Sequence, residues 1–174
     1  PLLAEMGYRA WAPDLRGYGE TEPKPKDVKA YLIDRLMEDV AAIIDASGAK
    51  TVTLLGHDWG AGLAWTFAAN AVRPLERLVI MNVPHPAVMA THLGKSWAQL
   101  KKSWYMFFFQ IPGLPERAMT ANDARAIRQA FHGMAIDKTH FTPDVLDRYA
   151  KDAQRPGAMT GMINWYRAAF RLRG

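Results

Sequence analysis

A nearly apolar run ends in an acid at the start of a helix of small residues, in the stretch LLGHDWGAG at residues 54–62. The run TVTLLG (51–56) predicts a strand buried on both faces of a parallel sheet, and the Ala-rich residues 59–72 predict a helix packed closely on it. Because almost no loop is left between them, the join must be a sharp turn with small residues at Gly56 and Gly60. Asp58 at its apex is then expected at the carboxyl edge of the sheet, where open α/β sheets bind ligands.

Asp58 has two interpretations on this pattern. Asp is a favoured helix N-cap, and a Gly-x-Asp-x-Gly loop taken alone is more often a cap or a ligand loop than a catalytic site. Alternatively, Asp58 is a nucleophile, because a carboxylate is already ionised at neutral pH and a helix N-terminus stabilises its charge. The backbone N–H of Trp59 would point into the same space.

The rest of the first half alternates between strand and helix patterns. YRAWAPD (8–14) and RLVIMN (77–82) predict two more strands, and residues 28–46 predict a helix that begins after Asp27 and ends at Gly48. The expected order is βαβαβ, which gives a parallel sheet with right-handed crossovers and an α/β fold class.

The second half shows helical patterns only. Prolines separate the four expected helices, which lie at about 95–110, 121–132, 142–153 and 158–172. We therefore expect two domains, an α/β piece at 1–83 and an all-helical piece at 84–174.

Composition excludes several classes of protein. The net charge is +5, but basic residues are dispersed among acids, and the densest group (Lys24, Lys26 and Lys29) lies in a Pro-rich loop that we expect to be solvated. No nucleic-acid partner is therefore predicted. No apolar run has the length of a membrane span and no leader is visible, so we expect a cytoplasmic protein without a membrane partner. The chain has no Cys, and its histidines lack acidic partners at metal-ligand spacing, so no metal is expected.

The joins after the three expected strands carry a family resemblance. They read APDLRGYGET (12–21), LLGHDWGAG (54–62) and NVPHPAV (82–88). In this order and spacing they resemble the epoxide hydrolase branch of the α/β-hydrolase superfamily, over essentially the whole chain. The resemblance implies a partial α/β-hydrolase core, a helical cap (lid) over the nucleophile, no cofactor, and a small apolar epoxide and water as substrates.

The resemblance also implies roles for individual residues. Asp58 would attack an epoxide carbon to form an ester, which water then opens to a vicinal diol, with the Trp59 N–H stabilising the oxyanion. Two cap tyrosines would protonate the epoxide oxygen: Tyr105 in SWYMFFFQIPG (103–113) and Tyr166 in NWYRA (164–168). By periodicity alone, each tyrosine is more often a core residue. His57 is expected to be a buried, hydrogen-bonded support residue rather than the base.

Parts of the family pattern are not in this sequence. The family's His-Gly-x-Pro loop and its later acid and histidine have no match, so we expect a fragment that does not turn over by itself. Two alternatives to an epoxide hydrolase stay open. One is a haloalkane dehalogenase, which uses the same Asp and would bind halide through the Trp59 indole. The other is a non-catalytic relative, either truncated or ligand-sensing.

Overall fold

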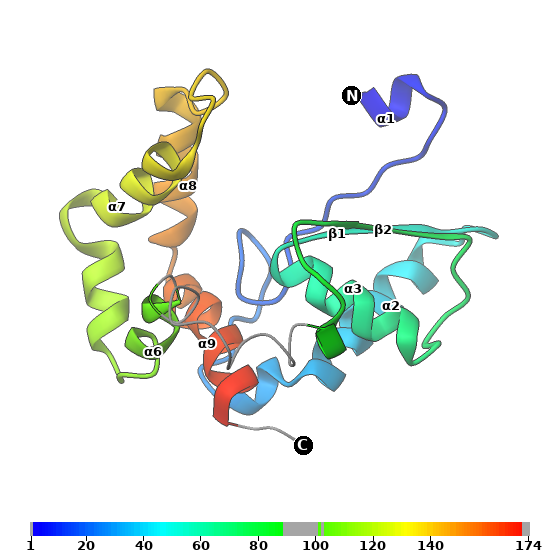
Figure 1. The fold of residues 1–174 in the computed structure, drawn as a ribbon, viewed down its shortest axis with the longest axis horizontal. Coiled ribbons are helices and arrows are strands. Elements are labelled where there is room, and N and C mark those ends of the chain that lie inside the picture. The colour runs from blue at the N-terminus through cyan, green and yellow to red at the C-terminus, as the bar shows by residue number, and fades with distance from the viewer. Residues whose placement is uncertain (1, 89–100, 102, 172–174) are drawn as a thin grey trace.

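The computed structural model describes residues 2–88, 101 and 103–171, and Figure 1 shows their arrangement. Two parallel strands and their helices form one half, and helices alone form most of the other. The elements in chain order are α1 (Leu2–Glu5), the 3-10 helix η1 (Val28–Tyr31), α2 (Ile33–Ser47), β1 (Thr53–His57), α3 (Trp59–Ala69), β2 (Arg77–Met81), α6 (Trp104–Phe108), α7 (Leu114–Met134), α8 (Pro143–Ala153) and α9 (Ala158–Arg171).

The sheet consists of β1 and β2, which run parallel and are joined by α3. Their register pairs Leu55 with Val79 and His57 with Met81. The predicted strands at 51–56 and 77–82 and the helix between them are therefore confirmed. The predicted strand at 8–14 is wrong, because these residues have no regular structure. A strand exists only where its backbone groups pair in a ladder, and residues 8–14 pair with neither β1 nor β2. The βαβαβ order is accordingly reduced to βαβ.

The two faces of this sheet differ. In Figure 1 the sheet is seen edge-on, with α2 and α3 on one side of it. Alternate residues on the other face are exposed, and Leu55 keeps 49% of its surface accessible. The expectation of strands buried on both faces is thus wrong for the described residues, because their helices cover only one side.

Local signals explain where η1 begins and where α2 ends. Asp27 is a cap, but of η1 rather than α2, since its Oδ1 accepts a hydrogen bond of 2.9 Å from the Lys29 N–H. Gly48 ends α2 in the left-handed conformation with φ 60°, as its position after the helix predicts. Leu36, Val40 and Ala41 form the buried face of α2.

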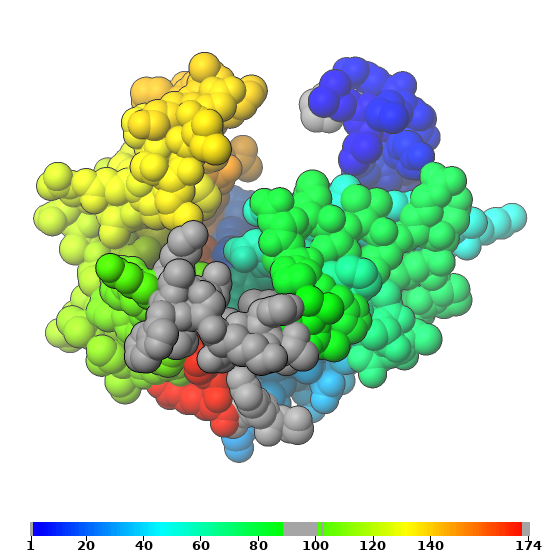
Figure 2. Space-filling view, viewed as in Figure 1, coloured from blue at the N-terminus to red at the C-terminus, as the bar shows by residue number. Residues whose placement is uncertain are grey.

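The second half is helical as predicted. Helices α8 and α9 lie at the expected 142–153 and 158–172, whereas the first part of the expected helix 95–110 falls outside the described residues. Helix α7 starts earlier than the predicted 121–132 and is interrupted by non-helical backbone from Ala121 to Ala124. Figure 2 shows a hollow between the yellow surface near the start of α8 and the blue N-terminal residues.

Helix α9 contributes to two hydrophobic clusters. Trp165 and Ala168 pack with residues of η1, α2 and α3, including Tyr31, Val40 and Phe67. Met159 and Ile163 on another face of α9 pack with the end of α6 and with α8. In Figure 1 α9 accordingly lies between the two halves of the chain.

The loop before η1 packs directly on α9. A Cβ added to Gly161 would lie 2.7 Å from Gly17 Cα, so the two backbones touch. The Lys24 side chain in this loop is only 3% exposed, and its ammonium group binds Glu22 Oε1 at 2.6 Å. The expectation of a solvated Lys24 is therefore wrong, because lysine can bury its stem under a neighbouring segment while its charge stays paired.

The tight approach of β1 and α3 yields a test with a matched control. A Cβ on Gly56 would lie 2.5 Å from Gly60 O, whereas a Cβ on Gly60 would meet nothing within 4 Å. We expect Gly56→Ala to lower the free energy of unfolding by about 2 kcal/mol, as overpacking does. Gly60→Ala should leave it unchanged or raise it by up to about 1 kcal/mol, because Ala favours helices. Chemical denaturation of the full-length protein measures both, and equal losses would contradict the geometry.

Candidate active site

Asp58 stands at the apex of the turn between β1 and α3. Its backbone has φ 52° and ψ −124°, a conformation that residues other than Gly rarely adopt. Its carbonyl oxygen accepts the N–H groups of Ala61 and Gly62, but its carboxylate makes no capping hydrogen bond. Asp58 therefore occupies the N-cap position of α3, but its side chain does not cap the helix, and the exposed carboxylate is available to a ligand.

The neighbours of Asp58 are arranged by the same turn. Gly56 is buried against α3 and must lack a side chain, while Gly60 has free space where a side chain would be. As the first residue of α3, Trp59 has a backbone N–H without a partner inside the helix. This N–H is suited to an oxyanion next to Asp58.

His57 lies on the exposed face of the sheet rather than in the core. Its Nε2 is 3.1 Å from the side-chain amide nitrogen of Asn82, which follows β2. The residue is hydrogen-bonded, as expected, but it is not buried, because no described helix covers that face. The imidazole therefore links the ends of the two strands.

Tyr105 and Tyr166, from α6 and α9, come together beside the turn. Their rings meet edge to face with centroids 5.9 Å apart, and Tyr166 meets the Trp59 ring in the same way at 4.9 Å. Tyr166 is half-buried and Tyr105 remains 38% exposed. The structure thus brings together residues far apart in the sequence, around the Asp58 turn.

The electrostatics of the site keep both phenols protonated. Burial raises the pKa of Tyr166 to about 12, and a hydrogen bond from the Trp59 side chain opposes this rise. The negative charges that Tyr105 and Asp58 carry when ionised raise the pKa of Tyr166 further. Burial, and then the Asp58 charge, also raise the pKa of Tyr105. Neutral phenols beside a carboxylate can donate hydrogen bonds and protons.

Tyr18 belongs to the same cluster and was not among the predicted site residues. Its ring meets Trp165 edge to face at 5.9 Å. Burial raises the pKa of its hydroxyl well above the usual range, and the charges of Tyr166 and Asp58 add to this. The signal in the sequence was its place in RGYG (16–19), within one of the three joins that carry the family resemblance.

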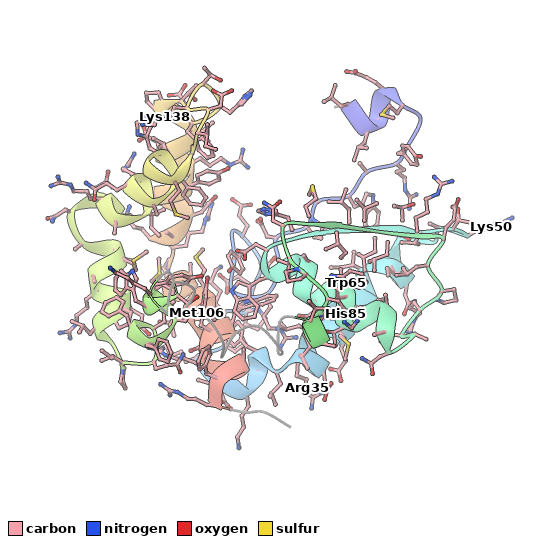
Figure 3. All side chains as sticks on the ribbon, in the orientation of Figure 1. Arg35, Lys50, Trp65, His85, Met106 and Lys138 are labelled. Atoms are coloured by element: carbon pink, nitrogen blue, oxygen red, sulfur yellow. The ribbon has the colours of Figure 1, made fainter. Side chains whose placement is uncertain are left out.

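The segment after β2 is held to α3. The Trp65 indole N–H donates to the Val83 carbonyl at 3.3 Å, and its ring packs edge to face on His85 with centroids 5.0 Å apart (Figure 3). His85 Nδ1 accepts the Ala87 N–H at 3.2 Å. These contacts indicate that His85 has a structural role where the chain leaves β2.

Two features that other functions would require are absent from the described residues. In residues 2–88, 101 and 103–171, no three His, Asp or Glu side chains gather as a metal site would require. Over the same stretch, the helices are too short or too polar to cross a bilayer.

The sequence of this chain matches a known protein family and curated proteins. The family described as alpha/beta hydrolase fold matches residues 1–165. The AB hydrolase superfamily protein YfhM of Bacillus subtilis (strain 168) is 38% identical over 166 residues, which are 95% of this chain and 57% of that protein. Epoxide hydrolase 4 of Homo sapiens is 38% identical over 167 residues, 94% of this chain and 46% of that protein. The chain therefore spans about half the length of these curated relatives.

Solved structures of epoxide hydrolases are similar to this chain as well. A crystal structure of Bacillus megaterium epoxide hydrolase with an inhibitor superposes with a TM-score of 0.79 at 32% identity, covering 88% of this chain and 53% of that one. A mutant of the same enzyme, complexed with its naphthyloxy-propanediol product, gives a TM-score of 0.78 at 33% identity, with the same coverage. The chain belongs to the alpha/beta hydrolase fold family, and within that family it is homologous to epoxide hydrolases.

Proposed function

We propose that the full-length protein hydrolyses an apolar epoxide to a vicinal diol through a covalent ester on Asp58. The observation that carries this proposal is an uncapped Asp58 carboxylate at a turn whose next residue, Trp59, packs on Tyr166, which in turn packs on Tyr105. Homology to epoxide hydrolases supports it. The proposal includes no cofactor, and the cytoplasmic location and the domain division at 83/84 stay predictions.

Ring opening is the first step. An Asp58 oxygen attacks an epoxide carbon, the carbon–oxygen bond of the ring breaks, and the electron pair moves to the departing ring oxygen. Tyr105 and Tyr166 share that developing charge, and one of them transfers its proton to give a hydroxyl group. An alkoxide is costly in apolar surroundings, so a positioned proton donor speeds this step.

Ester hydrolysis is the second step. Water attacks the carbonyl carbon of the Asp58 ester, the Trp59 N–H stabilises the oxyanion, and collapse breaks the ester bond to the diol oxygen. One water proton goes to that oxygen and releases the diol, and the other returns to the ionised tyrosine as the Asp58 carboxylate is restored. Within the described ranges, none of the histidines pairs with Asp58, and His57 is bound to Asn82. The base that activates this water is therefore assigned to none of them.

The site itself favours an apolar substrate. Aromatic rings surround Tyr166, with Trp59 and Phe109 each at a centroid distance of 4.9 Å. The product in the Bacillus megaterium structure carries a naphthyloxy group. An aryl glycidyl ether is therefore the first substrate to test.

The two alternatives predict different products. A dehalogenase needs donors for a departing halide and no proton, and here the Trp59 side chain instead contacts Tyr166. A non-catalytic relative would bind ligand without forming an ester. Release of diol, release of halide, or neither distinguishes the three.

The decisive experiment mixes the full-length protein with an aryl glycidyl ether and quenches it in acid. Mass spectrometry should show the alkyl ester on the peptide that contains Asp58, and diol should accumulate in solution. Asp58→Asn should form no ester, because a neutral amide is a poor nucleophile.

Asp27→Asn is the matched control, since it makes the same chemical change at an acid that caps a helix. It should alkylate like the parent. Ester formation by Asp58→Asn, measured before the amide hydrolyses to Asp, would remove Asp58 from the mechanism.

Removing either phenol should slow one step only. Tyr166→Phe and Tyr105→Phe should each lower the rate of ester formation by about a hundredfold, the typical contribution of a general acid, and leave ester hydrolysis nearly unchanged. Single-turnover kinetics with the aryl glycidyl ether separates the two rates.

The pH profile gives an independent check of the same role. A raised pKa keeps the phenol protonated as pH rises, so ester formation should not decline at the ordinary tyrosine pKa of about 10. It should fall only as the pH nears about 12, where Tyr166 loses its proton. For the variants Tyr166→Phe and Tyr105→Phe, equal slowing of ester formation and ester hydrolysis would contradict the acid role.

A further inference from the structure

Arg167 is a buried charge directly next to Tyr166. It is 6% exposed and lies on the face of α9 that packs against the helical half. A buried guanidinium is tolerated only when its donors are satisfied, and each nitrogen of Arg167 has a partner. No step of the proposed reaction uses this residue.

The contacts of Arg167 lead to one place. Its Nε donates to the Phe109 carbonyl at 3.0 Å and its Nη2 to the Ile111 carbonyl at 2.8 Å. These carbonyls lie at the end of α6 and in the turn after it. Because α6 also carries Tyr105, Arg167 ties the helix of one phenol to the helix of the other.

An acid from a third helix completes the arrangement. Glu116, in the first turn of α7, accepts from Nη1 at 2.6 Å and from Nη2 at 3.2 Å, and Asn164 Oδ1 accepts from Nη1 at 3.3 Å. Such a bidentate pair fixes the plane of the guanidinium as well as its position. Lysine cannot reproduce it, because an ammonium group has no planar fork.

The residue on the other side of Tyr166 is anchored to the first half of the chain. The Trp165 indole N–H donates to the Arg16 carbonyl at 2.9 Å, and Trp165 as a whole is 2% exposed. Tyr166 therefore lies between one neighbour bound to the loop before η1 and another bound to α6. The position of Tyr105 relative to Tyr166 depends on the second of these anchors.

We propose that Arg167 is a positioning residue that fixes α6, and with it Tyr105, against Tyr166 for proton transfer. The inference rests on the proposed function, because the spacing of the phenols affects the rate only if they serve the same ring oxygen. Displacements of about 1 Å in such groups cost large factors in rate.

The test compares Arg167→Lys with the parent in the full-length protein, using the aryl glycidyl ether as the probe. We expect ester formation per active site to fall by about tenfold or more, with ester hydrolysis unchanged. In a Tyr105→Phe background the same substitution should have little further effect, because the phenol that it displaces is already gone.

A purely structural role would give another result. Arg167→Lys would then lower the melting temperature or the fraction of active protein, and the rate per active site would stay within about twofold of the parent's, well below the loss expected from misplacement. That result overturns the proposal. Arg35→Lys is the control, because Arg35 pairs with Glu38 at 2.9 Å on the exposed surface of α2, away from α6 (Figure 3). It should change neither rate.

Glu116→Gln decides the matter if Arg167→Lys does not fold. It removes the charge of the pair while Arg167 can still reach the two carbonyls at the end of α6. A smaller loss, confined to ester formation, supports the proposal, and an unchanged rate per active site overturns it.

A readout without turnover separates this inference from the proposed function. In protein labelled with fluorotyrosine, the fluorine resonances of Tyr105 and Tyr166 should both shift in Arg167→Lys. If the parent forms no ester but both resonances shift, the proposed function fails, and with it the role in proton transfer, whereas the fixing of α6 against Tyr166 by Arg167 is shown. If the parent forms ester and neither the resonances nor the rate change, the positioning role fails alone.

Discussion

Helix α9 approaches the loop before η1 so closely that neither backbone has room for a side chain. Gly17 and Gly161 make this contact, and the hydrogen bond from Trp165 to the Arg16 carbonyl fixes its register. The result is a helix that belongs to two hydrophobic clusters at once. Tyr166 is therefore held beside the Asp58 turn by a helix that packs on both halves of the chain. Arg167 of the same helix binds the end of α6 and so fixes α6 against α9.

The turn itself stores strain. A positive φ at Asp58 costs of order 1–3 kcal/mol, and the structure recovers none of it through a capping bond. Tight packing at Gly56 keeps the strand and helix in the geometry that imposes this conformation. In this conformation the carboxylate is exposed and caps none of the helix N–H groups. Such strained residues gather at functional sites, which agrees with the proposed nucleophile.

Periodicity and turn chemistry were enough to predict β1, α3, β2 and most helices, because these depend on local sequence. They failed where the outcome depends on distant partners. Residues 8–14 have strand propensity but no strand to pair with, and Lys24 is buried because α9 covers its loop. Tyr105 and Tyr166 were identified through family resemblance, since periodicity favoured core roles. The contacts of Arg167 and Tyr18 are not visible in the sequence, because their partners lie far away along the chain.

The central claim is that Asp58 becomes esterified and that water opens the ester at its carbonyl carbon. A single turnover in heavy-oxygen water tests it most directly, with mass spectrometry of both the diol and the peptide that contains Asp58. The ester mechanism predicts heavy oxygen in the Asp58 carboxylate and none in the diol, because the second diol oxygen comes from the aspartate. Heavy oxygen in the diol with an unlabelled Asp58 would mean direct attack by water and would contradict the account.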